Sequence, residues 1–337
     1  MDFVAINSPL DVYKKQVENS GGHIYILPRT GKRIISYWLG LRKLIKENQY
    51  DIVHVHGNSH TTVLDLSAAR AAGCVVCMCH AHNTACDHAA VHFLLTPIFN
   101  MLCNGRIACG EKAGKFMFGN KTFHVLNNGV DTKRFEFDEK KRLAIRKQLD
   151  WGNDTKVIGH VGYFKAVKNH RFIIDVFLDL YRRDCSYRLL LIGDGLLRNE
   201  IERRLEKEGL IEAVHFAGNI DNVDEYLNAF DLVLMPSLYE GLPLALIEQQ
   251  ANGLQCVVSD TITQEVDKTG NVTFLPLSQP ARVWADTIDS IKAYSERKER
   301  SKQAILDIKS AGYSIYEEAS TLKKIYREAI ELKVERS

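Results

Sequence analysis

The fold is decided by residues 232–252, which read LVLMPSLYEGLPLALIEQQAN. The run begins as a continuous apolar strand that ends at Pro236, and a loop containing Glu240 follows. Pro243 then stands at the favoured first position of a helix, and Gly253 stands where a left-handed residue ends that helix. A buried strand that leads through a short loop into a helix is typical of parallel sheets covered by helices on both faces.

The same unit recurs along nearly the whole chain, where short runs rich in Val, Ile and Leu alternate with longer amphipathic stretches. The predicted strands are His23–Pro28, Asp51–His56, Val75–Ala81, Arg106–Cys109, His124–Asn127, Val157–Gly162, Arg188–Gly193, His215–Gly218, Leu232–Pro236 and Gln255–Ser259. The predicted helices include Ile34–Glu47, Arg171–Tyr181, Leu196–Glu208, Pro243–Asn252 and Ser314–Val334. This alternation predicts an α/β protein with doubly wound parallel sheets.

The length of 337 residues indicates two domains of about 150 residues each. The strand series restarts at Val157 after a polar, charged stretch. We therefore predict an N-terminal Rossmann-like domain over 1–145, a C-terminal domain over 146–312, and a closing helix over 313–337 that packs back toward the N-terminal domain. Because doubly wound sheets bind ligands beyond the carboxyl ends of their strands, we expect the two domains to face each other across a cleft.

Composition excludes several classes of protein. Lys and Arg total 44 against 42 for Asp and Glu, so the net charge of +2 provides no basic face for nucleic acid. The N-terminus lacks the pattern of a signal peptide. The longest apolar neighbourhood, His92–Cys103, is interrupted by Pro97 and falls short of the roughly 20 residues that a membrane span needs. We expect a cytoplasmic protein, and the sequence leaves open a peripheral contact at the inner face of the membrane.

The eight cysteines allow two interpretations. The segment from Cys74 to His92 is rich in cysteine and histidine, which raises a metal site as one alternative. However, Cys77 and Cys79 fall inside a run that is typical of a buried strand, and no second pair follows at zinc-site spacing. We therefore predict buried free thiols and no metal ligands.

Glu240 and Glu248 flank the start of the predicted helix, where unpaired amides and the helix dipole make a natural phosphate site. Taken alone, Glu240 is equally consistent with a charge that merely favours the positive end of the helix, and Glu248 with a surface charge. Together, in this strand–loop–helix context, they resemble the E-x7-E motif of family 4 retaining glycosyltransferases, which have the GT-B fold of two facing Rossmann-like domains.

This resemblance implies that Glu240 contacts the donor sugar and that Glu248 binds the ribose hydroxyls of the nucleotide, since a carboxylate accepts hydrogen bonds from two neighbouring hydroxyls. The residues between them that the resemblance places beside the donor are Gly241, Leu242, Pro243 and Leu244.

Other segments follow the order of the same family. Gly162 opens a stretch that resembles the family's Gly-Arg…Lys-Asn segment, in which Lys168 matches the lysine that neutralises the donor pyrophosphate. Gly195 ends a Gly-Asp-Gly turn, Ile220 lies in a loop that resembles the base-binding loop, and His82 matches a histidine beside the donor sugar. Taken singly, these residues also read as a surface lysine, a tight turn, a packing residue and a loop histidine.

The resemblance is to bacterial capsule and exopolysaccharide transferases of the family. It implies a retaining, metal-independent hexosyltransferase that moves a sugar from a nucleotide diphosphate sugar to a glycan or lipid-linked acceptor. No cofactor is expected besides the nucleotide sugar itself. The sequence shows no nucleophile–base pair, which is consistent with catalysis by positioning and electrostatics.

Two features depart from the family. Tyr163 stands where the family has a second phosphate-binding arginine, so we expect weaker stabilisation of the leaving group unless Lys165 substitutes. The chain begins with a short run, Asp2–Asn7, in place of the family's opening strand and Gly-rich loop, so we expect an N-terminal domain truncated at its start. These departures leave two alternatives: an inactive nucleotide-sugar-binding partner subunit, or another GT-B enzyme such as a nucleotide-sugar epimerase.

Overall fold

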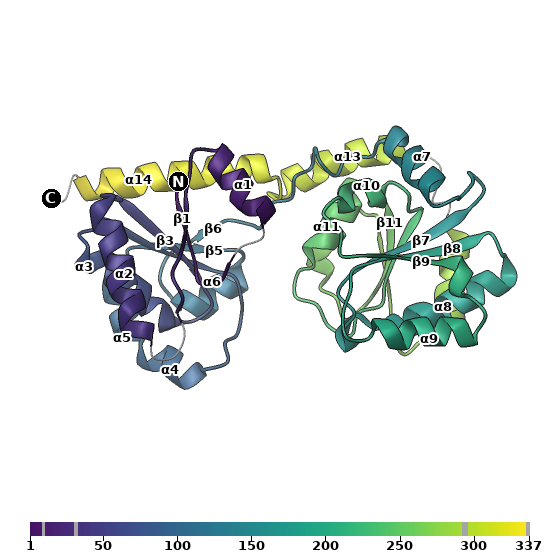
Figure 1. Ribbon diagram of the computed structural model, residues 1–337, viewed down its shortest axis with the longest axis horizontal. Helices are drawn as coiled ribbons and strands as arrows, with labels where there is room; N and C mark the ends of the chain where they lie inside the picture. The colour runs from purple at the N-terminus through teal and green to yellow at the C-terminus, as the bar shows by residue number, and fades with distance from the viewer. Residues whose placement is uncertain (9–10, 30–32, 292–295, 335–337) are drawn as a thin grey trace. The chain divides into compact units, whose positions relative to one another are not determined.

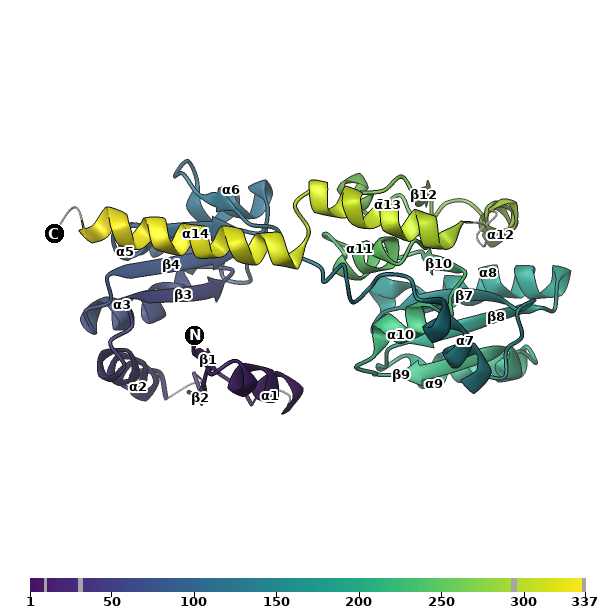
Figure 2. The same cartoon turned by 90° about the horizontal axis from the view of Figure 1, so that it is seen from above.

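The computed structural model describes residues 1–8, 11–29, 33–291 and 296–334. The chain forms two compact units, drawn in Figures 1 and 2. Unit 1 comprises Met1–Asn127 and Ala319–Ser337, and unit 2 comprises Asn128–Glu318. Each unit contains a parallel sheet flanked by helices, so the predicted α/β class with two Rossmann-like domains is confirmed.

The main sheet of unit 1 has four parallel strands in the order β3-β4-β5-β6. These are β3 (Ile52–Gly57), β4 (Val76–Ala81), β5 (Gly105–Ala108) and β6 (His124–Val125). The helices are α2 (Ile34–Glu47), α3 (Val63–Ala71), α4 (Ala89–Leu94), α5 (Thr96–Leu102) and α6 (Glu111–Phe118). Cys77 and Cys79 of β4 point into the core that α2 and α3 cover. Val76 and Met78 point the other way, where Ile325 packs on them. Ile325 belongs to α14 (Ile315–Val334), the long helix that runs beside this sheet in Figure 2.

The predicted strand His23–Pro28 is shorter than expected and lies outside this sheet. It forms β2 (Ile24–Ile26), which pairs in parallel with β1 (Phe3–Ala5) in a separate two-stranded sheet, and α1 (Asp11–Asn19) connects the two strands. Three-residue strands bury little apolar surface, and Phe3, Val4 and Ile26 remain exposed.

Unit 2 is built on six parallel strands in the order β12-β11-β10-β7-β8-β9. The strands are β7 (Lys156–Val161), β8 (Tyr187–Ile192), β9 (Val214–Gly218), β10 (Leu232–Met235), β11 (Gln255–Ser259) and β12 (Val272–Leu275). One face is covered by α8 (His170–Arg183), α9 (Arg198–Lys207) and α12 (Ala281–Ser290), and the other by α10 (Val223–Leu227), α11 (Leu244–Ala251) and α13 (Arg297–Ser310) (Figure 1). The strand order reverses between β7 and β10, the place where such sheets bind ligands.

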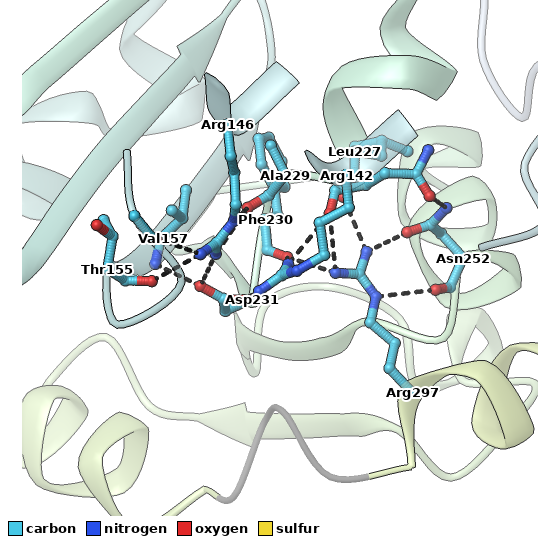
Figure 3. Close-up of polar contacts among 12 residues, drawn as sticks. Arg142, Arg146, Thr155, Val157, Leu227, Ala229, Phe230, Asp231, Asn252 and Arg297 are labelled. Carbon is cyan, nitrogen blue, oxygen red and sulfur yellow. Dashed lines mark hydrogen bonds and ion pairs between the residues drawn. The ribbon is translucent and has the colours of Figure 1, made fainter. Parts of the chain in front are cut away.

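The boundary between the units lies after Asn127, earlier in the chain than the predicted position after residue 145. The reason is a buried charge network that ties α7 (Glu139–Gln148) to unit 2 (Figure 3). Arg142 and Arg146 both donate to the carboxylate of Asp231, each at 2.5 Å. Arg297 of α13 donates to neighbouring carbonyls of the same loop, among them that of Leu227 at 2.8 Å.

The closing helix α14 contributes its residues from Ala319 onward to unit 1. Tyr326 and Ile330 are among the partly buried side chains that pack there. None of the helices in the described residues is both long and apolar enough to cross a membrane.

Candidate functional site

Two loops meet at the reversal point of the unit 2 sheet, one after β7 and one after β10. The amide of Leu238 donates to the carbonyl of Val167 at 2.8 Å, and Nδ2 of Asn169 donates to the carbonyl of Pro236 at 3.1 Å. These bonds hold together two segments that are far apart in the sequence. They place Lys168 and Glu240, both predicted as catalytic residues, side by side.

Lys168 and Glu240 form an ion pair in which Nζ lies 2.7 Å from Oε1. The side chains are 18% and 17% exposed, so the pair is largely shielded from water. Oε1 of Glu240 has no well-aligned hydrogen bond in the described parts of the chain, so the attraction is mainly that of the two charges. Lys168 ends a short 3-10 turn (Ala166–Lys168), and Asn169 follows in the left-handed region with φ of 55°. A cation and a carboxylate are thus held at one point beside the start of α11.

Two of the predicted glycines permit this close approach. A Cβ atom at Gly162 would lie 3.2 Å from the stem of Lys168 and 2.9 Å from Nε2 of His160. Gly195 has a φ of +155°, and a Cβ atom there would lie 2.8 Å from the ring of Tyr163. Any larger residue at either position would displace the groups that line the site.

Glu248 lies on α11, and no side chain caps the N-terminus of that helix. The amide of Leu246 donates to the carbonyl of Pro243 at 3.0 Å, so the amides at the very start of the helix, those of Leu244 and Ala245, are the ones that could meet a phosphate. Burial raises the pKa of Glu248, and the positive charge of Arg134 opposes this shift. Arg134, which sequence reasoning missed, is held by Oδ1 of Asp224 at 2.9 Å and by the carbonyl of Asp221. Its local sequence carries no signal of this role, because its partners come from a distant loop.

The residues between the two glutamates shape the turn into α11. Gly241 is exposed and faces open space, and Pro243 is buried at the helix start. Leu242 and Leu244 pack against the core of unit 2. The predicted donor-binding segment therefore presents backbone at its surface and side chains to the core.

A pocket of about 620 Å³ lies next to Gly195. It is lined by Tyr163, Asp194, Gly195, Leu196, Arg198, Asn199 and Asn219. Sequence reasoning did not single out Arg198, which contacts Glu202 at 2.8 Å and holds its guanidinium 5.4 Å from the ring of Phe216. Ile220, predicted to contact the base, is partly buried and packs against the core of unit 2, and its contact with a base stays a prediction.

Tyr163, which replaces the family's arginine, is 45% exposed. The ammonium of Lys165 lies 5.1 Å from the centre of the Tyr163 ring, a cation–π distance. A positive charge is therefore present beside the ring of Tyr163.

In unit 1, His82 follows β4 and lies in a cluster of histidine rings. Its Nε2 is 2.8 Å from Nδ1 of His56, and its ring stacks 4.2 Å from that of His80. Burial, reinforced by neighbouring histidines, lowers the pKa of His80 to about 2 and that of His54 to about 3. Because His82 and Glu240 belong to different units, their joint action on one sugar stays a prediction.

In the described parts of the chain all eight cysteines are free thiols, but the prediction that they are buried is wrong for Cys86 and Cys109, which are half-buried, and for Cys185, which is exposed. Cys74, Cys77, Cys79, Cys103 and Cys256 are buried. The residues that come together as potential metal ligands are histidines instead.

Two family profiles match the chain, one in each half. Residues 3–134 match "Glycosyltransferase Family 4", and residues 141–304 match "Glycosyl transferases group 1". The first profile ends and the second begins near the linker that leads from unit 1 into α7.

The chain is also similar to individual proteins. It is 34% identical over 344 residues to the protein named "Putative glycosyltransferase EpsF" of Bacillus subtilis (strain 168), covering 96% of this chain and 88% of that protein. It is 29% identical to the UDP-Gal:alpha-D-GlcNAc-diphosphoundecaprenol alpha-1,3-galactosyltransferase of Escherichia coli, over 66% of this chain and 61% of that one. HepE of Anabaena, solved in complex with UDP and glucose, has the same fold, with a TM-score of 0.76 at 15% identity over 97% of this chain and 91% of HepE.

Proposed function

Because this chain belongs to glycosyltransferase family 4 and has the GT-B fold, we propose that it is a retaining hexosyltransferase of surface polysaccharide synthesis. Its donor is a nucleotide diphosphate sugar and its acceptor a glycan or a lipid-linked sugar. The observation that supports this proposal best is the Lys168–Glu240 pair beside the uncapped start of α11. The pair combines a cation for a diphosphate with a carboxylate for sugar hydroxyls at a single point.

In the proposed reaction the bond between the anomeric carbon and the diphosphate oxygen breaks while the acceptor hydroxyl attacks from the same face. The hydroxyl proton passes to the departing diphosphate, and a new glycosidic bond forms with retained configuration. Lys168 and the first-turn amides of α11 neutralise the charge that develops on the diphosphate. No metal or cofactor takes part in this proposal, because this chain's own cation and helix terminus supply the positive charge.

The nucleoside is held by Glu248, whose carboxylate accepts hydrogen bonds from the two ribose hydroxyls. Arg134, whose charge acts on Glu248, favours the ionised form that this role needs. The pocket lined by Arg198 and Asn219 lies beside the Gly-Asp-Gly turn, and we assign the base to this region together with Ile220. His82 completes the assignment as a group that holds the sugar.

A lipid-linked acceptor would bring the protein to the inner face of the membrane. Helices α4 and α5 of unit 1 support such a peripheral contact, because they expose large apolar side chains. These are Val91, Phe93, Leu94, Ile98 and Met101. Co-sedimentation with vesicles tests the contact: Phe93→Glu with Leu94→Glu should release the protein, and unchanged sedimentation would argue against it.

The proposal as a whole is tested by isothermal titration with UDP, GDP and ADP, combined with a donor-hydrolysis assay. Glu248→Ala should weaken nucleotide binding, and Glu240→Ala should reduce turnover more than binding. Unchanged activity in both variants would contradict the assignment. Nucleotide binding without turnover of any donor would favour the alternative of an inactive partner subunit, and analysis of the product's anomeric configuration tests retention.

A further inference from the structure

Three histidines share one face of the unit 1 sheet at the carboxyl ends of adjacent strands. His54 and His56 are two residues apart on β3, so their side chains point to the same face. His80 of β4 lies directly opposite His56 in the parallel register. The centres of the three rings are 4.5 Å (His54–His56), 5.4 Å (His54–His80) and 5.2 Å (His56–His80) apart.

The nitrogens of these rings converge and are poorly satisfied. One ring nitrogen from each histidine lies within 4.8 Å of the other two. Nε2 of His54 and both ring nitrogens of His80 are buried and lack a well-aligned hydrogen bond among the described residues, although the backbone of Leu126 makes a weaker polar contact with the His80 ring. A buried polar group left without a partner costs about 1–3 kcal/mol, so an arrangement that leaves three such atoms together indicates a missing ligand.

The remaining ring nitrogens are tied down in a way that suits metal binding. Nδ1 of His54 lies 2.6 Å from the hydroxyl of Tyr326 on α14, and Nδ1 of His56 lies 2.8 Å from Nε2 of His82. Such bonds set the ring orientation and leave Nε2 as the nitrogen that binds. An anion would require protonated rings, which crowding and burial disfavour, whereas a metal ion binds the neutral imidazole.

We propose that His54, His56 and His80 form a binding site for a divalent transition-metal ion of the zinc type, with a fourth position open. Three imidazoles with an open position are a ligand set that Zn²⁺ accepts. Tetrahedral coordination at about 2.0–2.1 Å brings the nitrogens to about 3.3 Å from one another, so the rings have to close by about 1.5 Å at most. The site lies in unit 1, whereas Lys168 and Glu240 lie in unit 2, and its ligands His56 and His80 adjoin His82, the histidine that we assign to the sugar.

This histidine site differs from the metal site that was one alternative for the cysteine-rich segment Cys74–His92. Cys77 and Cys79 point to the opposite face of β4, into the core of unit 1, so they are not available to an ion held by His80. The two possibilities differ in spectrum, because a thiolate ligand adds a sulfur-to-metal charge-transfer band to bound Co²⁺ and an all-imidazole site does not.

Metal-free full-length protein is titrated with Co²⁺ and Zn²⁺ by isothermal titration and visible spectroscopy. We expect one equivalent to bind, with d–d bands and no sulfur band. His54→Gln, His56→Gln and His80→Gln should each weaken the affinity by at least about tenfold. His124→Gln is the matched control, because His124 is an exposed histidine in β6 of the same sheet. The metal affinity of this variant should equal that of the natural protein.

Circular dichroism and UDP binding are recorded on every variant to verify the fold of the protein. If His80→Gln does not fold, His56→Gln decides the question, because His56 is exposed and its loss leaves the core intact. The proposal is overturned if Co²⁺ does not bind, if binding survives in both His54→Gln and His56→Gln, or if a sulfur band appears. If the natural protein binds Co²⁺ but does not bind UDP, the metal site is supported and the proposed function is contradicted.

Discussion

The ammonium of Lys168 lies 2.7 Å from Oε1 of Glu240, and this contact joins the loops that follow β7 and β10. The two residues are brought together at the reversal point of the sheet, where the strand order places β7 beside β10. The ammonium of Lys168 is suited to the diphosphate, and the carboxylate of Glu240 is suited to the hydroxyls of the sugar. Their contact means that the two groups are positioned by each other as well as by the backbone.

Lys168→Gln should lower kcat by about 10²- to 10³-fold with a much smaller change in nucleotide affinity. The reason is that a preorganised charge at a developing anion contributes more to the transition state than to the ground state. Steady-state kinetics with the donor measure both effects. Lys156→Gln is the control, since it also removes an ion pair in unit 2, that with Asp184 at 2.9 Å. Equal losses in both variants would indicate a structural effect instead.

Tyr163→Arg should raise turnover by about tenfold or more, because it restores the family's second cation and charged hydrogen bonds contribute about 1.5–3 kcal/mol. The side chain of Tyr163 is 45% exposed, so an arginine fits without disturbing the core. Tyr163→Phe serves as the control and should give no gain. If Lys165 already supplies the charge, Lys165→Ala will reduce turnover in the natural protein and Tyr163→Arg will rescue it. A Tyr163→Arg variant no faster than the natural protein, together with an inert Lys165→Ala, would contradict this account.

As the pH falls, nucleotide binding should begin to weaken at a higher pH than it would if an exposed glutamate bound the ribose. Burial raises the pKa of Glu248, so its carboxylate takes up a proton earlier as the pH falls, and the acid form loses the acceptor capacity that ribose needs. Titration calorimetry from pH 7 to pH 4.5 measures this change, and the profile of Glu248→Gln should be flat.

For the unliganded protein, the effect of acidification on the free energy of unfolding has the opposite sign. A raised pKa means that folding favours the protonated form, so the stability cost of Glu248 is present above its pKa and disappears as the pH falls.

Asp231→Asn should destabilise unit 2 by about 3–5 kcal/mol, because it leaves the buried guanidiniums of Arg142 and Arg146 without their carboxylate (Figure 3). Urea unfolding followed by circular dichroism measures the loss. Asp184→Asn breaks an exposed pair with Lys156 and should cost no more than about 1 kcal/mol. Similar costs for the two substitutions would show that the buried network contributes little.

Local sequence patterns were sufficient to predict most of the helices and strands. The amphipathic period of Ile34–Glu47 predicts the bounds of α2 as the structure has them, and the predicted strands of unit 2 agree with β7 to β11 within a residue or two. The strand β12 was missed, because its four residues are only half-buried and lack a long apolar run. His23–Pro28 was predicted as a strand from its apolar content, yet its place in a separate sheet depends on pairing with β1.

The sequence by itself determined the α/β class, the two-domain organisation and the segment from Glu240 to Glu248, because each depends on residues that are neighbours along the chain. Only the tertiary structure decided that Lys168 pairs with Glu240, that Arg134 acts on Glu248, and that Asp231 ties α7 to unit 2. Likewise, only the register of β3 against β4 brings His54 and His56 to His80. Contacts between distant segments depend on strand order and loop packing, and no local pattern encodes either of these.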